Sequence, residues 1–313
     1  MKVHVFEVGP RDGIQAIEPF VDTGTKRDLI DALYSAGVEQ VEEVSFAHPR
    51  IMPQMKDAED VFSGRGSALV MNQRGFDRAM DTGVSKVNVV LSACEQFSLK
   101  NLRRTNSEVV HSLFQVLNGY PRENVRVYIS MSFGSPYSGQ VEDRNMKSLI
   151  RDAKMLGDTV VFADTVGVGT AGEVRKWAEM ALDAGLKPAL HLHHRGDESK
   201  ALALIRAGLL HGIKEFDSSI GGLGGCPFAI GSGANLSTET LVRHLHAWGF
   251  ETGIDLEHLK RASVIAKSIR GLSNERRADS TPSDEGPAPL VQGEVGGRQP
   301  QRQGRQAPAL WPF

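Results

Sequence analysis

Two histidines, His191 and His193, have the types and spacing best suited to chemistry, because one residue separates them in a strand-like run. Side chains at i and i+2 of a strand point to the same side, so both imidazoles can bind one metal ion. Packing alone is a poor explanation for such a pair, since buried imidazoles need hydrogen-bond partners. With a carboxylate they suit Zn, Mn or Fe, whereas further oxygen ligands and waters favour Mg or Mn. His194 should point the other way, toward the helices or the rim.

A cation and a carboxylate, Arg11 and Asp12, directly follow the first apolar run. Gly13 would allow the tight turn that directs both side chains inward. Asp12 is then a candidate third metal ligand, although an Asp-Gly turn with a solvated arginine is an equally ordinary interpretation. Glu42 and Glu43 are neighbours in the second apolar run, where only one of them can face inward. An inward acid near Arg11 would form an ion pair.

Two glycine-rich segments follow later in the chain. Residues 167–172 (GVGTAG) match the dinucleotide-binding pattern, but the next expected strand ends in histidines rather than in the acid that holds a ribose. We therefore do not expect nucleotide binding there. Residues 221–227 (GGLGGCP) carry Cys226 and lack the Lys-Ser or Lys-Thr of a P-loop. A lone cysteine is often only a small hydrophobic residue, so both a packing and a catalytic role stay open.

These residues need a scaffold, and the chain from residue 2 to about 270 alternates short apolar runs with amphipathic ones. The expected strands are residues 3–8, 40–46, 68–72, 87–92, 125–132, 159–164, 189–194 and 215–219. The expected helices are residues 26–36, 53–62, 75–82, 107–117, 141–156, 172–184, 199–210 and 238–248, with one more at 256–269. Strands that alternate with helices predict a parallel sheet of the α/β class.

Eight such units in about 250 residues match a (β/α)8 TIM barrel, with a doubly wound open sheet as the rival. Polar residues collect at the carboxyl ends of six strands, where a barrel has its active face. They are Arg11, Asp12, Glu42, Glu43, Glu95, Asp164, His191, His193 and Cys226. An open sheet would concentrate them at one switch point, so we expect a TIM barrel.

Composition divides the chain into two parts. Residues 1–271 form the expected catalytic barrel, whereas residues 272–313 are rich in Pro, Gly, Gln and Arg. A segment of that composition cannot bury enough apolar surface to offset its ordering entropy, so we expect a disordered tail.

Charge and cysteine content limit partners and compartment. The net charge is −2 and the ordered part has no basic stripe, so we expect no nucleic-acid partner. No apolar run approaches the ~20 residues of a membrane span, and the first residues lack the apolar region of a signal peptide. Cys94 and Cys226 lie far apart and form no disulfide framework. We expect a cytoplasmic protein with no membrane partner.

Several segments together resemble hydroxymethylglutaryl-CoA lyases in order and spacing. The main ones are residues 8–15 (VGPRDGIQ), 41–46 (VEEVSF), 163–170 (ADTVGVGT), 191–193 (HLH) and 222–229 (GLGGCPFA); others are 92–101, 133–139 and 233–239. The resemblance covers about residues 3–270. It extends to a wider group of metal-dependent barrels, from which the glycine-rich loop with its cysteine separates the lyases.

The resemblance implies retro-Claisen cleavage of a 3-hydroxy-3-methylglutaryl-CoA-like thioester, an acyl-CoA substrate, into acetyl-CoA and acetoacetate. It implies Mg²⁺ or Mn²⁺ bound by four residues, Asp12, His191, His193 and Asn235. It also implies a homodimer.

The same resemblance assigns the catalytic roles. Arg11 would stabilise the enolate on the thioester oxygen, and Glu42 would orient Arg11. Asp164, or a metal-linked neighbour, would help to remove the hydroxyl proton, and Cys226 would protonate the acetyl-CoA carbanion.

Three places near the expected acyl-recognition rim depart from the lyase pattern. Residues 194–200 (HRGDESK) replace an Asp followed by Thr-Tyr-Gly-Gln, Glu43 and Val44 replace two threonines, and Ser135 replaces a Cys. A larger 3-hydroxy-3-alkylglutaryl-CoA or citramalyl-CoA is therefore an alternative substrate. A condensing synthase of the same barrel group and a barrel that binds without catalysis are the alternative functions. A barrel that only binds would be expected to have lost the metal ligands or the thiol, and this sequence has kept all of them.

Overall fold

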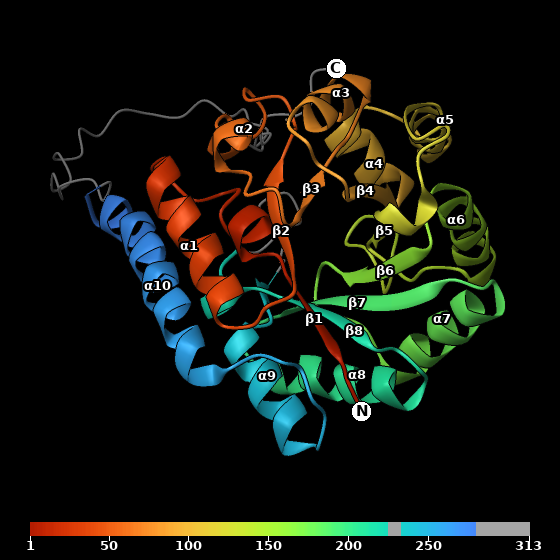
Figure 1. The fold of residues 1–313 in the computed structure, drawn as a ribbon. Coiled ribbons are helices and arrows are strands. Elements are labelled where there is room, and N and C mark those ends of the chain that lie inside the picture. The colour runs from red at the N-terminus through yellow and green to blue at the C-terminus, as the bar shows by residue number, and fades with distance from the viewer. Residues whose placement is uncertain (225–232, 280–313) are drawn as a thin grey trace, which may run out of the picture.

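The computed structural model describes residues 1–224 and 233–279. Its eight parallel strands pair in sequence order, and β8 pairs with β1, so the sheet closes into a barrel (Figure 1). The strands are β1 His4–Glu7, β2 Gln40–Ser45, β3 Ser67–Leu69, β4 Val87–Ser92, β5 Val125–Ser130, β6 Thr159–Asp164, β7 Lys187–His194 and β8 Glu215–Ser218. The prediction of a TIM barrel is confirmed.

Helices surround the strands as the apolar periodicity predicts. They are α1 Thr23–Ser35, α2 Ala58–Val61, α3 Gln73–Asp81, α4 Glu95–Leu102, α5 Asn106–Val116, α6 Asp143–Leu156, α7 Ala171–Asp183, α8 Glu198–Leu210, α9 Thr238–Ala247 and α10 Leu256–Asp279. A π-helical turn spans Gly9–Gly13, and 3-10 turns span Pro53–Met55, Arg122–Asn124 and Ile220–Gly222. Within the described residues, no helix has both the length and the apolar character to cross a membrane.

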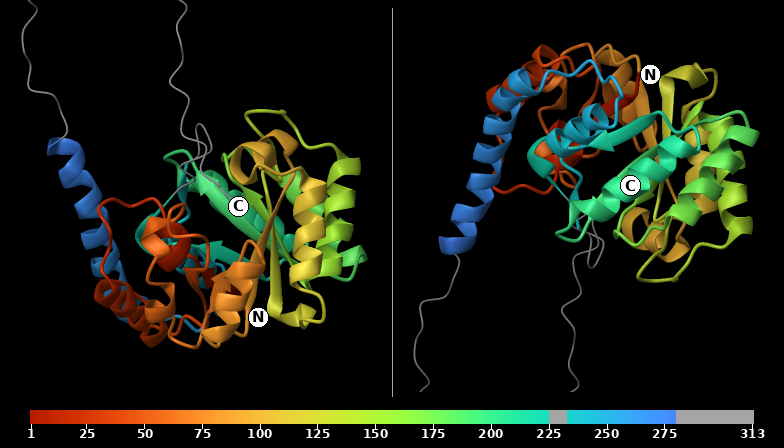
Figure 2. Two further views of the ribbon diagram at one scale, coloured as in Figure 1. Left: turned by 90° about the horizontal axis from the view of Figure 1, so that it is seen from above. Right: turned by 90° about the horizontal axis from the view of Figure 1, so that it is seen from below.

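Four elements differ from the sequence prediction. The helix predicted at residues 53–62 is divided into the 3-10 turn Pro53–Met55 and the short helix α2. Helix α4 is not predicted, and its N-cap is the unusual Cys94, whose Sγ accepts a hydrogen bond from Phe97 N. A two-residue strand, β9 Ala234–Asn235, pairs antiparallel with β7. Helix α10 continues to Asp279, ten residues beyond the predicted end at residue 269, and packs along α1 on the outside of the barrel (Figures 1 and 2). Residues 280–313, most of the predicted tail, lie outside the described residues.

The hydrophobic core and the barrel interior differ in character. Aliphatic side chains that point outward from the strands pack against the helices, as Val127 and Ile129 of β5 do. Their neighbours on the same strand, Arg126 and Tyr128, instead make buried hydrogen bonds to Asp217 on β8, across the barrel. The period-two alternation of the strands therefore separates an apolar layer from a polar interior, and that interior supports the site.

Candidate active site

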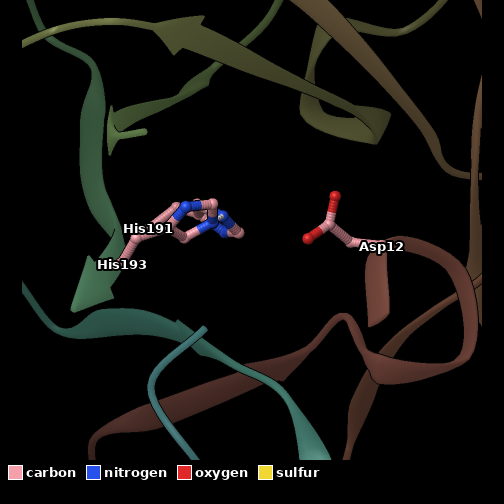
Figure 3. A group of neighbouring side chains, drawn as sticks. All are labelled: Asp12, His191 and His193. Carbon is pink, nitrogen blue, oxygen red and sulfur yellow. Dashed lines mark hydrogen bonds between the residues drawn. The ribbon is translucent and has the colours of Figure 1, made fainter. Parts of the chain in front are cut away.

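The structure brings Asp12, His191 and His193 together at the carboxyl end of the barrel (Figure 3). One ligand atom from each residue lies within 4.8 Å of those of the other two. Both imidazoles project from the end of β7 toward the Asp12 carboxylate, which the π-turn after β1 presents from the opposite side (Figure 3). The sequence prediction that these three side chains converge is confirmed.

The hydrogen bonds of the two imidazoles fix which ring nitrogens face the cluster. His193 Nδ1 lies 3.0 Å from the Thr165 carbonyl oxygen, which can only accept, and His191 Nδ1 lies 3.1 Å from Asp217 Oδ2. When both Nδ1 atoms donate, the neutral rings direct their Nε2 lone pairs at each other across 3.0 Å. Such an arrangement is unfavourable unless a cation lies between or beside the lone pairs. The donor set therefore fits a divalent metal ion.

Burial and the neighbouring charges shift the pKa values of all three clustered residues. Burial, and then the neighbouring His191, lowers the pKa of His193 to about 4. Burial also disfavours charge on His191, but Asp217 and Asp12 outweigh it and raise the pKa of that imidazole. Burial alone would raise the pKa of Asp12, yet Arg11 and the two histidines hold it below its usual range. Asp12 is thus an ionised carboxylate that faces the two imidazoles.

Arg11 is locked beside this cluster. Its Nε donates to Glu42 Oε2 at 2.6 Å, and its Nη1 donates to Asp12 Oδ1 at 3.0 Å. Glu42 also accepts a hydrogen bond from Asn88 Nδ2 at 2.7 Å. Although burial opposes charge on the guanidinium, Glu42 and Asp12 raise the pKa of Arg11, which stays cationic. The prediction that an inward Glu pairs with Arg11 is confirmed.

Glu43 confirms the other half of that prediction, because its side chain lies on the opposite side of β2. Its Oε1 accepts a hydrogen bond from the Tyr34 hydroxyl at 2.6 Å, and its Oε2 accepts one from Ser63 N at 2.7 Å. These partners belong to the helix layer. Glu43 therefore ties β2 to the outside of the barrel and makes no contact with the Arg11 cluster.

Gly13 serves the site through close packing rather than through a left-handed turn. A Cβ at this position would lie 2.8 Å from Leu223 Cβ and 2.9 Å from Ser219 Oγ. Gly224, which has a φ of +86°, approaches from the other side: its Cβ would lie 2.9 Å from the Asp12 carbonyl oxygen. The described end of the glycine-rich segment thus packs directly against the turn that carries Asp12. Cys226 itself lies outside the described residues.

Asn235 lies beside the cluster. Strand β9 pairs it with His193, and its Nδ2 donates to Asp12 Oδ2 at 2.8 Å and to the Leu223 carbonyl oxygen at 3.0 Å. The amide therefore links the aspartate to the base of the glycine-rich segment. Its role as a metal ligand stays a prediction.

Asp164 is engaged elsewhere. One carboxylate oxygen accepts from Val168 N at 2.9 Å and the other from Gly169 N at 2.8 Å. Burial raises the pKa of Asp164, while these amide hydrogen bonds oppose the rise. The glycine motif at residues 167–172 thus wraps around this carboxylate, and Asp164 is not one of the three clustered residues. Its part in proton transfer stays a prediction.

His194 turns away from the cluster, as predicted. Its backbone pairs with Ala234 of β9, and its Nε2 lies 3.9 Å from Glu198 Oε1 at the start of α8. The third histidine of the sequence run therefore belongs to the contact between β7 and α8.

Sequence reasoning missed the residues behind the cluster, Asp217, Arg126, Tyr128 and Asn88. Asp217 accepts hydrogen bonds from Arg126 Nη2 and from the Tyr128 hydroxyl, the latter at 2.8 Å. A signal was present, because Arg126-Val-Tyr128 and Glu215-Phe-Asp217 each place polar residues at alternate positions of an apolar strand. In a barrel such positions share the interior.

Two adjoining cavities extend from the site. A cavity of about 130 Å³ begins at Arg11 and Gln15 and has mostly apolar walls, such as Leu69 and Phe97. It shares Met71, Val90 and Leu102 with a cavity of about 750 Å³. The larger cavity lies among the loops after β2 and β3 and the helices α3 and α5, and its basic lining residues are His48, Arg50, Arg74, Arg78 and Arg104. The small apolar cavity beside Arg11 therefore adjoins the larger cavity with the basic lining.

The fold is that of the TIM-barrel enzymes, whose active sites lie at the carboxyl ends of the strands, and this barrel carries there three residues that could hold a metal ion. Within that class, the sequence profile of the HMGL-like family matches residues 2–265, and the chain belongs to this family.

Individual relatives agree with this assignment. The chain is 36% identical over 287 residues to a 3-hydroxy-3-isohexenylglutaryl-CoA/hydroxy-methylglutaryl-CoA lyase of Pseudomonas aeruginosa, covering 88% of this chain and 96% of that one. It is 36% identical to a cytoplasmic 3-hydroxy-3-methylglutaryl-CoA lyase of Danio rerio, covering 89% and 87%. Among solved structures, it resembles an HMG-CoA lyase from Acinetobacter baumannii in complex with coenzyme A and 3-methylmalate, with a TM-score of 0.80, 30% identity and coverage of 92% and 98%.

Proposed function

We propose that this carbon–carbon lyase cleaves a 3-hydroxy-3-methylglutaryl-CoA-type thioester into acetyl-CoA and acetoacetate. The observation that carries the proposal is the cationic Arg11, fixed by Glu42 and placed next to the cluster of Asp12, His191 and His193. A retro-Claisen cleavage needs both parts: a site that favours an alkoxide and a cation that favours the enolate.

Asp12, His191 and His193 would hold Mg²⁺ or Mn²⁺, with Asn235 as a fourth ligand. The bound ion would act as a Lewis acid on the tertiary hydroxyl and lower the free energy of its deprotonation. Asn235 would turn its Oδ1 to this position, and its backbone pairing with His193 keeps it within the site.

Arg11 would stabilise the negative charge that develops on the thioester oxygen when the C2–C3 bond breaks. Its guanidinium has little freedom, because Glu42 and Asp12 accept hydrogen bonds from it on two sides. A preorganised donor of this kind typically contributes about 10²–10³ in rate. Glu42 is in this scheme a positioning residue for Arg11.

Two proton transfers complete the reaction. The hydroxyl proton leaves to Asp164 or to a neighbour, and the C2–C3 bonding electrons pass to the thioester to form the enolate of acetyl-CoA. The ketone of acetoacetate forms at C3. Cys226 then protonates the acetyl-CoA carbanion. In the sequence Cys226 comes two residues after Gly224, which packs against the turn that carries Asp12.

The two cavities support an acyl-CoA as the substrate. The small apolar cavity beside Arg11 suits a slender pantetheine arm, and the adjoining basic cavity suits the phosphates of the nucleotide end. Arginine forms bidentate hydrogen bonds with phosphate, so we expect the basic cavity to prefer phosphate groups.

A second candidate is a substrate with a longer alkyl group on C3. The observation that favours it is the sequence of residues 194–200, which departs from the lyase pattern near the expected acyl-recognition rim. The name of the Pseudomonas aeruginosa relative includes both the isohexenyl and the methyl form of the substrate.

A panel of CoA thioesters separates these candidates. We would assay 3-hydroxy-3-methylglutaryl-CoA, its isohexenyl analogue and citramalyl-CoA with Mg²⁺ or Mn²⁺, and follow the release of acetyl-CoA. The proposal expects release from the first and strong loss in Cys226→Ser at unchanged metal content. Absence of acetyl-CoA from every thioester, with metal bound, would overturn it.

A further inference from the structure

Behind the cluster, Asp217 of β8 lies in a fully buried polar network. Arg126 Nη2 donates to Asp217 Oδ1, whereas Oδ2 accepts from the Tyr128 hydroxyl at 2.8 Å and faces His191 Nδ1 at 3.1 Å. Arg126 is itself held in place, because its guanidinium stacks over the Phe6 ring at 4.0 Å and pairs with Glu215. The Asp217 carboxylate is thus fixed at a single position inside the barrel.

We infer that Asp217 is a positioning residue that fixes His191 in the tautomer whose Nε2 can bind a metal ion. A neutral imidazole carries one proton, on Nδ1 or on Nε2, and only the unprotonated nitrogen can be a ligand. An acceptor at Nδ1 selects the Nδ1–H form and leaves the Nε2 lone pair toward Asp12 and His193. This inference rests on the proposed metal site.

Asp217 can fill only the acceptor role. Arg126 Nη2 can only donate to Oδ1, and the Tyr128 hydroxyl, which accepts a hydrogen bond from Arg126 Nε at 3.3 Å, directs its own proton to Oδ2. An ionised carboxylate has no proton to donate. His191 must therefore supply the proton in the hydrogen bond between them.

The substitution Asp217→Asn should reverse this selection. The amide nitrogen of the new side chain cannot face Arg126, which only donates, so the amide oxygen takes the Oδ1 position. The amide nitrogen then takes the Oδ2 position and donates to His191 Nδ1. That hydrogen bond selects the Nε2–H form, which has no lone pair for a metal.

The test compares wild type, Asp217→Asn and Tyr128→Phe. Titration with Mn²⁺, followed by electron paramagnetic resonance, should give about 10–100-fold weaker binding in Asp217→Asn. Tyr128→Phe keeps the carboxylate and its contact with His191, so its Mn²⁺ affinity should stay within a few-fold of wild type. Urea unfolding of each variant checks that the fold is retained.

A second measurement needs no metal. Imidazole ¹⁵N NMR at pH 8 should show a proton on His191 Nδ1 in wild type and its loss from that nitrogen in Asp217→Asn. If Asp217→Asn keeps the Nδ1–H form and wild-type Mn²⁺ affinity, the inference is wrong. If wild type fails to bind Mn²⁺ at all, the proposed metal site is wrong, and the NMR result still decides the tautomer.

Discussion

His191 and His193 illustrate how single residues acquire a role through the atoms behind them. Each Nδ1 has a hydrogen-bond acceptor, Asp217 Oδ2 for one ring and the Thr165 carbonyl oxygen for the other. Because both acceptors lie away from Asp12, both Nε2 atoms are left facing the cluster. The chemistry of the site is therefore decided by which ring nitrogen is occupied, and not merely by the presence of imidazoles.

Replacement of His193 by Ala should abolish metal binding, since one of three clustered ligands is lost. Metal content after incubation with Mn²⁺ and gel filtration measures the effect. The matched control is His194→Ala, which removes an adjacent imidazole that faces Glu198 instead and should leave the metal content unchanged. Stoichiometric Mn²⁺ in His193→Ala would contradict the ligand assignment.

Arg11→Lys should lower kcat about 100-fold or more, because an ammonium keeps the charge but cannot contact Glu42 and Asp12 with separate, fixed donors. Metal content should remain as in wild type. Arg27→Lys on the exposed face of α1 is the matched control and should show wild-type turnover. A kcat within threefold of wild type for Arg11→Lys would exclude it as the group that stabilises the enolate.

At the scale of elements, the site depends on the turns that follow β1 and β8. Glu7, at the end of β1, accepts hydrogen bonds from Gly9 N at 2.7 Å and from Ile220 N at 2.8 Å. It also accepts one from the Thr238 hydroxyl at the start of α9. A single buried carboxyl group thus joins the turn that carries Asp12 to the segment that leads into the glycine-rich loop.

This connection should give stability a defined pH dependence. Burial, opposed by its hydrogen bonds, raises the pKa of Glu7 from 4.5 to about 7. The folded protein then holds a proton that the unfolded chain has already released, so the free energy of unfolding falls as pH rises from 4.5 to about 7. The expected loss is ~3 kcal/mol. The Gln side chain in Glu7→Gln does not ionise, so this variant should lack that loss of stability.

Urea unfolding at pH 5 and pH 8.5 measures the effect of Glu7 as a difference between wild type and Glu7→Gln. Other groups titrate in both proteins, so their contributions cancel in this comparison. Equal losses of stability in the two proteins would show that Glu7 does not carry a raised pKa.

The basic cavity between α3 and α5 makes a prediction about the substrate. Arg74→Ala should raise KM for the CoA thioester about tenfold with little change in kcat, because a charged hydrogen bond to phosphate is lost far from the reacting carbon. The matched control is the N-acetylcysteamine thioester of the same acid, which lacks the nucleotide and should show no change. Equal KM effects on both thioesters would argue against phosphate recognition by Arg74.

At the scale of the whole molecule, the barrel has an apolar outer layer and a polar interior. The interior network spans the barrel from Arg126 on β5 to Asp217 on β8 and ends at His191 in the candidate site. Binding at one end of the cylinder should therefore stabilise the closed sheet as a whole. Assembly into a homodimer stays a prediction, which light scattering of the purified protein would test.

Removal of metal should lower the midpoint of thermal unfolding. At a free concentration of 100 times the Kd, a ligand of the folded state adds about 2.7 kcal/mol, which for a protein of this size corresponds to roughly 4 °C. Scanning calorimetry with Mn²⁺ and after dialysis against EDTA measures this shift. His193→Ala should unfold at the same temperature under both conditions, and a persistent shift in that variant would place the bound ion elsewhere.

Much of the architecture could be predicted, because local patterns carry it. The predicted strands agree with β1–β8 to within a few residues, since alternation and turn signals mark short buried runs. Helix α4 was missed because it is short and its cap is the Cys94 sulfur, a weak acceptor that no capping pattern includes. The turn at Gly9–Gly13 was recognised for its residues, but its glycines serve close packing against Leu223 and Ile220, which are distant in sequence.

The sequence by itself predicted a TIM barrel with His191 and His193 on one side of its seventh strand, and the resemblance to the lyases added Asp12 to them. Period-two alternation and the position of residues at strand ends are local properties, so they can be recognised in the sequence without knowledge of the tertiary contacts. Only the tertiary structure decided that Asp217 stands behind His191, that Arg126 holds Asp217 from 91 residues away, and that Asp164 is engaged by loop amides. Those contacts join strands that are remote in sequence, and only the closure of the sheet brings them within hydrogen-bond distance.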